Sequence, residues 1–152
     1  MNHKRHHDGH DGHDDHDEIR FRMRLPSPLS EDVERLMTRT IDCAMDIHRK
    51  LGPGYLDSIY EKAMCIALEK AGLAFECEKA ILVHYEGVAI SGQRVDLIVD
   101  ERVVVELKAV QRLDRIHYSQ VVSYLRTMRL RAGLLINFHE TLLHRGIRRV
   151  VL

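Results

Sequence analysis

The segment from Arg94 to Val110 places the strongest limits on how this chain can fold. Two runs of mainly β-branched apolar residues flank a short charged turn at 100–102, a pattern that predicts a β-hairpin. Three charged residues nevertheless interrupt these runs, namely Asp96, Glu106 and Lys108. A core strand avoids such side chains unless they are paired or bind an ion, so the hairpin has to place them where a partner can reach them.

The register of this hairpin decides whether the three charged side chains meet. Side chains alternate across a strand, so Glu106 and Lys108 share a face. An odd-length loop that pairs Val99 with Val103 puts Asp96 opposite Glu106 and gathers all three on that face. A two-residue loop would shift the register and separate Asp96 from Glu106. We predict the odd-length loop, although the turn lacks the glycine that is usual in three-residue hairpin loops.

Such a cluster suits metal-assisted hydrolysis of phosphodiesters. Two neighbouring carboxylates repel each other, and Mg²⁺, which prefers hard oxygen ligands, relieves that repulsion. The ammonium group of Lys108 could orient an attacking water or neutralise charge on a phosphate. The alternative is a salt-bridged pair on a solvated sheet face, because Glu-x-Lys alone is a common sequence. The hairpin pattern by itself leaves both interpretations open.

The same residues resemble the motifs of a known family. Asp96 followed by Glu106-Leu107-Lys108 is similar to the core of the PD-(D/E)XK nuclease superfamily. Upstream, residues 51–60 resemble the signature of the bacterial GxxExxY family within that superfamily. The likeness runs from about Val33 to the C-terminus. One departure is that the motif glutamate is Asp57 here, which shortens the acid by one methylene.

The resemblance implies an α/β, restriction-endonuclease-like fold, with a mixed β-sheet flanked by helices. It also implies hydrolysis of nucleic acid, with DNA as the expected substrate and Mg²⁺ or Mn²⁺ as the cofactor. Asp96 and Glu106 would hold the metal with help from the Leu107 carbonyl. Asp57 would be the third acid, bound directly or through water. Lys108 would orient the nucleophilic water.

The helices that flank the hairpin carry further candidates. Gln120 matches the place of a polar residue on the helix after the Glu-x-Lys strand, where the resemblance implies that it positions substrate or water; the alternative is an exposed glutamine. His117 is a weaker candidate for a phosphate contact. On the helix predicted at 56–71, Asp57 shares a stripe with Tyr60 and Glu61. Glu61 is a backup for the third acid if the helix is rotated, but we expect it to face solvent. The core face is expected to consist of Leu56, Ile59, Ala63, Ile66, Ala67 and Leu68.

The N-terminal residues form a separate segment. Residues 1–28 are predicted to be a disordered tail and linker, and residues 29–152 the nuclease-like domain. The tail repeats His and Asp, so its imidazoles could capture Zn²⁺ or Ni²⁺, or it could be a solvated tail with incidental affinity. Without residues 1–18 the chain holds 21 basic and 17 acidic residues, a balance that permits nucleic-acid binding without requiring it.

Composition also suggests where the protein works. Cys43, Cys65 and Cys77 are odd in number and lie in apolar patterns, so we predict buried thiols in a reducing cytoplasm. The sequence contains no apolar run of membrane-spanning length, and no membrane partner is expected. A homodimer stays open, because no dimer surface can be recognised in the sequence.

Two further functions remain as alternatives. One is a catalytically inactive module of the same fold that binds nucleic acid or protein, which the replacement of the motif glutamate by Asp57 and the scarcity of aromatic residues favour. The other is a metal-buffering protein built around the tail. Removal of residues 1–18 separates the latter from a nuclease, because only the buffering protein would lose its function.

The predicted element order is helix, helix, three strands, helix and two strands, which suits an α/β fold.

Overall fold

The computed structural model describes residues 27–152, so the predicted metal capture by the His- and Asp-rich tail lies outside the described residues. The elements, in chain order, are α2 (Glu31–Leu51), α3 (Asp57–Lys70), β1 (Phe75–Tyr85), β2 (Val88–Val99), β3 (Val103–Lys108), α4 (Arg115–Met128), β4 (Ala132–Asn137), the 3-10 helix η1 (Leu143–Gly146) and β5 (Ile147–Val151). The predicted order of helices and strands is confirmed.

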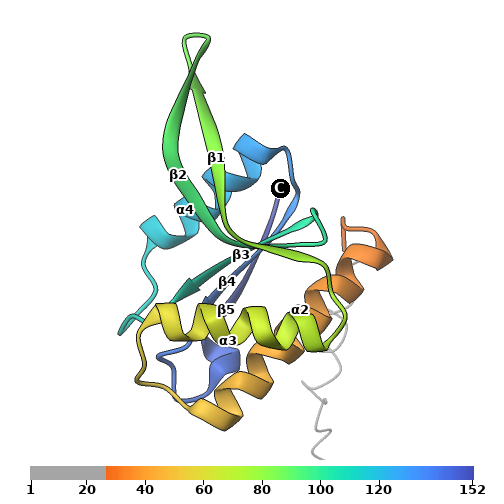
Figure 1. The fold of residues 1–152 in the computed structure, drawn as a ribbon, viewed down its shortest axis with the longest axis vertical. Helices are drawn as coiled ribbons and strands as arrows, with labels where there is room; N and C mark the ends of the chain where they lie inside the picture. Colours follow the sequence, from red (N-terminus) through yellow and green to blue (C-terminus); the bar gives the residue numbers. More distant parts are fainter. Residues whose placement is uncertain (1–26) are drawn as a thin grey trace, which may run out of the picture.

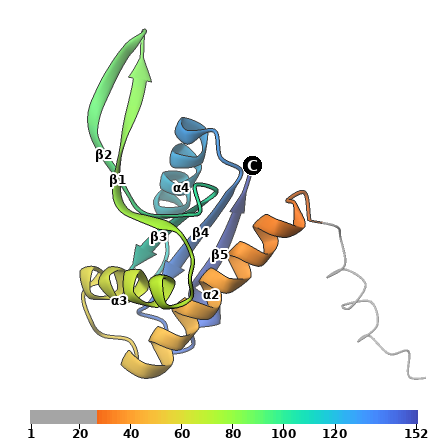
Figure 2. The same ribbon diagram turned by 45° about the vertical axis from the view of Figure 1, so that its right-hand side comes forward.

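The strands form one mixed sheet with the order β1-β2-β3-β4-β5. β3 and β4 are parallel, and the other neighbouring pairs are antiparallel. The parallel pair needs a crossover connection, which α4 supplies. Helices α2 and α3 cover one face of the sheet and α4 covers the other (Figures 1 and 2). The predicted α/β architecture is therefore confirmed.

The β2–β3 hairpin has the predicted register. Val99 pairs with Val103 and Ile98 with Val104, around a three-residue loop at 100–102. The loop reaches this geometry without glycine because Asp100 and Glu101 both adopt positive φ angles, 51° and 57°. Asp adopts positive φ angles more readily than most residues, and neither Asp nor Glu is branched at Cβ, where branching would make the conformation costly. The odd-length loop therefore places the charged residues as predicted.

Helix α3 buries only part of the predicted face: Leu68 is buried, and Ala63 and Ala67 pack against the core. Its buried residues are Tyr60, Met64 and Leu68, whereas Leu56, at 74% exposure, and Ile66 lie on the surface. Tyr60 stacks on Phe138 with 4.4 Å between ring centroids. Because the aromatic ring and Met64 supply more buried area than the smaller residues of the predicted face, the helix is rotated towards the Asp57 stripe.

Strands β1 and β2 extend far beyond the rest of the sheet (Figures 1 and 2). We call residues 82–92, the outer part of this ribbon, the arm. A register shift between Ile81 and Val83 marks its start, and Gly92 at φ 113° lies on the opposite strand; a glycine inside a strand commonly marks a bulge or bend. The arm exposes several apolar side chains, and its tip is the Glu86-Gly87 turn.

Candidate active site

The candidate site lies where β2 separates from β3. Ladder pairing between the two strands ends at Leu97 and Val105, one residue before Asp96 and Glu106 would pair. The Asp96 carboxylate bridges this gap, because its Oδ2 accepts a hydrogen bond from the Leu107 N–H at 2.8 Å. A side chain thus replaces a missing ladder bond and holds Asp96 beside β3.

Glu106 is the most deeply buried acid of the site. It is 4% exposed, and its Oε2 has no hydrogen-bond partner among the described residues. Burial and the neighbouring charge of Asp96 raise the pKa of Glu106 to about 8. Burial also raises the pKa of Asp96. The Leu107 N–H stabilises the charged form of Asp96. When one of the two acids is protonated, the proton therefore resides on Glu106.

Lys108 lies next to Glu106 and at the start of a hydrogen-bonded chain. Its Nζ is 3.5 Å from Glu106 Oε1 and donates to Gln120 Oε1 at 3.0 Å. Gln120 in turn donates from Nε2 to the Tyr124 hydroxyl at 2.7 Å. Gln93 of β2 donates to the same hydroxyl at 2.8 Å. The structure therefore brings together Asp96, Glu106, Lys108 and Gln120 as the sequence predicts.

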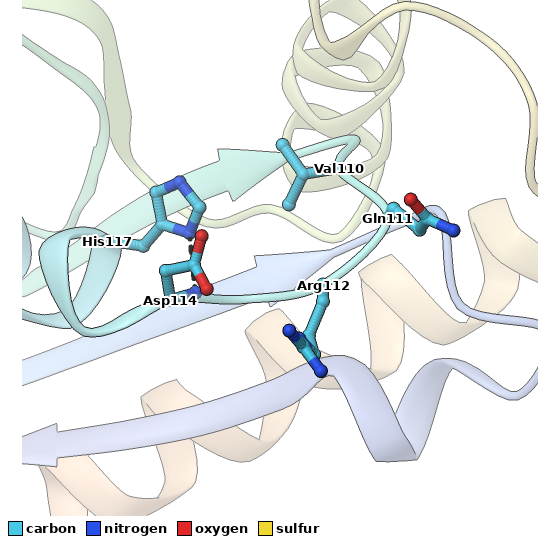
Figure 3. A pocket seen from close by; sticks show the side chains of 5 residues that line it. All are labelled: Val110, Gln111, Arg112, Asp114 and His117. Carbon is cyan, nitrogen blue, oxygen red and sulfur yellow. Dashed lines mark hydrogen bonds between the residues drawn. The ribbon is translucent and has the colours of Figure 1, made fainter.

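The loop after β3 lines a cavity of about 660 Å³ (Figure 3). Arg112 and His117 are among its lining residues. Asn137, fully buried at the end of β4, fixes the loop because its amide bonds both the N–H and the C=O of Val110. His117 Nδ1 accepts from the Asp114 N–H at 3.0 Å, so His117 completes the cap of α4.

The α3 acids approach the site from the other face of the sheet. Asp57 is exposed, and its Oδ1 accepts from the Ser58 N–H at 2.8 Å, as a first-turn acid does. Its charge still acts on Asp96. Between residues 27 and 152, no three His, Cys, Asp or Glu side chains are grouped as a set able to hold a metal ion, so Asp57 is not in ligating position with the pair.

For Glu61 the expected solvent-facing position is wrong, and the alternative of a rotated helix that turns Glu61 towards the site agrees with the structure. It is half-buried rather than solvent-facing. Burial, followed by the charges of Asp96, Glu78 and Asp57, raises the pKa of Glu61 to about 7. Its place four residues after Asp57 on the same helical stripe is what made it the backup acid. The rotation of α3 that buries Tyr60 and Met64 turns this stripe, and Glu61 with it, towards Asp96.

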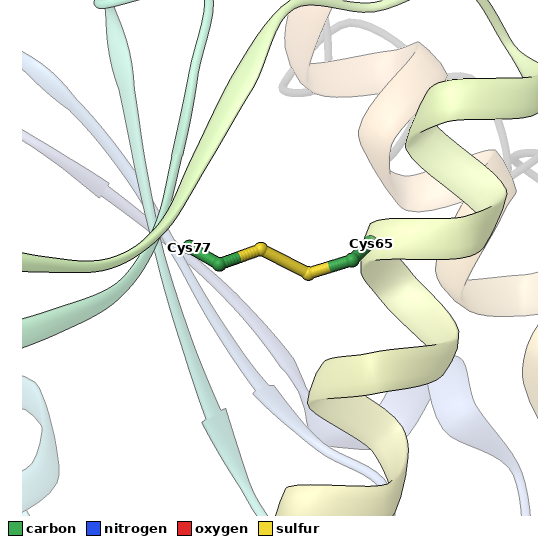
Figure 4. The surroundings of a disulfide bond; sticks show 2 residues. All are labelled: Cys65 and Cys77. Carbon is green, nitrogen blue, oxygen red and sulfur yellow. A yellow bond between two sulfur atoms is a disulfide. The ribbon is translucent and has the colours of Figure 1, made fainter.

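A disulfide between Cys65 and Cys77 ties α3 to β1 (Figure 4). The prediction of three buried thiols is therefore wrong for this pair and right for Cys43, which is buried and free. The tight turn at Gly72, with φ 71°, returns the chain alongside α3 and brings the two cysteines together.

None of the helices in residues 27–152 combines the length and the apolar character that a membrane span requires.

The fold and the acid-lysine cluster together define a nuclease-like domain, and comparison with known families agrees. The model of the PD-(D/E)XK nuclease superfamily matches residues 34–150. The chain therefore belongs to the PD-(D/E)XK nuclease superfamily, and its five-stranded mixed sheet is a restriction-endonuclease-like α/β fold. No curated protein and no solved structure matches the chain.

Proposed function

We propose that this protein is a Mg²⁺- or Mn²⁺-dependent nuclease of the GxxExxY branch, with DNA as its substrate. The observation that carries the proposal is the buried Glu106 Oε2, which has no partner among residues 27–152 and lies beside a second acid. Burying such an oxygen is costly unless a proton or a cation compensates it. Membership of the superfamily supports nucleic acid as the class of substrate.

The donor set suits a hard divalent cation. Asp96 and Glu106 contribute carboxylate oxygens, and we propose the Leu107 carbonyl as a third ligand. Asp57 and Glu61 would complete the site through water, since neither forms a ligand cluster with the pair among the described residues. A divalent cation held there supplies Lewis-acid catalysis, which neutralises charge on a phosphate and favours ionisation of the attacking water.

The chain's own residues would carry the remaining steps. Lys108 is only 18% exposed, so its ammonium is directed at the site and would hold the attacking water and the charge that develops on the phosphate. Gln120 fixes Lys108 through the bond to its Oε1. Glu106 would hold a cation in its deprotonated form, because metal ligands have to be deprotonated. The cavity lined by Arg112 and His117 lies next along the chain, where a neighbouring stretch of substrate would fit.

Calorimetric titration of the full chain with Mg²⁺ tests the metal site. Acids of the N-terminal segment can also bind Mg²⁺, but they are the same in wild type and variant, so the difference between the two measures the hairpin site. Wild type should bind Mg²⁺ at this site, and Glu106→Gln should lose that part of the binding. Glu101→Gln is the matched control, because it makes the same change at an exposed position of the same hairpin. Equal binding by wild type and Glu106→Gln would contradict the assignment.

A non-catalytic module of the same fold is the second candidate. Two observations favour it: Asp57 replaces the motif glutamate, and no three-ligand cluster forms among the described residues. Such a module would bind DNA with or without Mg²⁺ and leave it intact. Incubation of plasmid DNA with the protein and Mg²⁺ or Mn²⁺ separates the two, since only the nuclease yields nicked or linear products.

A further inference from the structure

Gln93 has no role in the site described so far, yet its side chain reaches it. The residue lies on β2 at the base of the arm, three residues before Asp96. Its Nε2 donates to the Arg94 carbonyl at 3.2 Å and to the Tyr124 hydroxyl at 2.8 Å. Because a carbonyl oxygen can only accept, the Arg94 contact fixes the orientation of the Gln93 amide and directs its NH₂ group towards Tyr124.

The other end of the chain is fixed in the same way. Lys108 can only donate, so Gln120 has to present Oε1 to it and its NH₂ group to Tyr124. The Tyr124 oxygen therefore accepts one hydrogen bond from each glutamine. Both of its lone pairs are used, and its own hydrogen is directed away from the two amides. Tyr124 is 3% exposed, whereas Gln93 lies on an exposed part of β2.

We propose that Gln93 is a positioning residue that orients Lys108 through Tyr124 and Gln120. The proposal rests on the proposed nuclease function, in which Lys108 is the catalytic residue. Without the Gln93 donor, the Tyr124 hydroxyl hydrogen can turn towards Gln120, and this favours a flipped Gln120 amide that places Oε1, in place of Nε2, beside Tyr124. The Gln120 amide then exchanges between two orientations, and one of them presents its NH₂ group to the Lys108 ammonium. Loss of Gln93 lowers the fraction of molecules in which Lys108 is held correctly.

A double-mutant cycle tests this chain. Cleavage of a DNA duplex with Mg²⁺ is measured for wild type, Gln93→Met, Tyr124→Phe and the double variant, with Ser91→Ala as a control on the same strand. Gln93→Met should lower kcat about fivefold, as the loss of one hydrogen bond does. KM and the Mg²⁺ affinity should not change, because Gln93 contacts neither substrate nor metal. The double variant should be no slower than Tyr124→Phe alone.

Additive effects in the cycle, or a loss confined to KM or to Mg²⁺ affinity, would overturn the proposal. A second readout does not depend on activity: the side-chain NH₂ resonances of Gln120, assigned by their loss in Gln120→Met, should shift in Gln93→Met and stay in place in Ser91→Ala. If wild type cleaves nothing, the nuclease proposal fails. The Gln120 resonances alone then test whether Gln93 is linked to Gln120 through hydrogen bonds to Tyr124. Unchanged Gln120 resonances in Gln93→Met would overturn it.

Discussion

At the residue scale, the protonation of Glu106 links stability to pH. In the unfolded chain its carboxyl ionises near the ordinary pKa of 4.5, whereas in the fold its pKa is about 8. Between these values only the folded state keeps the proton, so unfolding releases one. The free energy of unfolding without metal should therefore fall as pH rises from about 4.5 to about 8 and then level off. The raised pKa of Asp96 acts in the same direction.

Urea denaturation at several pH values between 5 and 8.5 measures this fall. Glu106→Gln keeps the shape and cannot ionise, so its stability should depend less on pH and should exceed that of wild type at the alkaline end. Glu101→Gln, at an exposed position, should follow the wild-type curve. A Glu106→Gln curve parallel to the wild-type one would show that another group carries the pH dependence.

Lys108 gives a second prediction at this scale. Lys108→Ala removes the ammonium 3.5 Å from Glu106 and the donor to Gln120, so cleavage should fall at least about a hundredfold, as it does when a transition-state donor is removed. The fold should survive, which circular dichroism can check. Lys79→Ala, on the surface of β1, is the control and should keep full activity. Full activity in Lys108→Ala would contradict the nuclease assignment.

At the element scale, Gly133 sets how closely α4 approaches the sheet. A Cβ at this position would lie 2.7 Å from Val121 Cγ1 and 3.4 Å from Leu125 Cδ1. Gly133→Ala should therefore displace α4, cost about 1–3 kcal/mol of stability, and carry Gln120 away from Lys108. Urea denaturation measures the first effect and cleavage the second.

A compensating variant tests the cause. Val121→Ala removes the methyl group that the new Cβ would meet, so adding it to Gly133→Ala should recover part of the lost activity. Val121→Ala alone should destabilise the fold modestly by leaving a cavity. If the double variant is less active than Gly133→Ala, the contact between α4 and β4 is not what limits the position of Gln120.

The elements also show which features a sequence can predict. The hairpin register followed from alternation, because a slip by one residue would have exposed a whole apolar face. The orientation of α3 did not follow, because apolar residues occur on more than one of its faces and only packing against Phe138 selects Tyr60 and Met64. Glu61 was misplaced for that reason. The Cys65–Cys77 pair depends on how α3 meets β1, which no local pattern encodes.

At the scale of the whole molecule, the site is distributed over two parts of the chain. Asp96, Glu106, Lys108 and Gln120 belong to one continuous stretch, and their clustering follows from a hairpin and the next helix. Asp57 and Glu61 come from α3, on the opposite face of the sheet. The contacts within the stretch from Asp96 to Gln120 could be predicted from the sequence. The position of α3 relative to this stretch could be seen only in the tertiary structure.

The position of the arm should allow the chain to be split into two fragments that reassociate. A break in the chain between Glu86 and Gly87 falls in an exposed turn, where interruptions are tolerated best. It would yield one fragment with the α3 acids and another with the Asp96–Gln120 cluster, to be rejoined through β1 and β2. Neither fragment alone should cut DNA, and mixing them should restore cleavage. If the proposed nuclease activity holds, the arm would provide a two-part reporter, in which cleavage signals that two fused proteins have met.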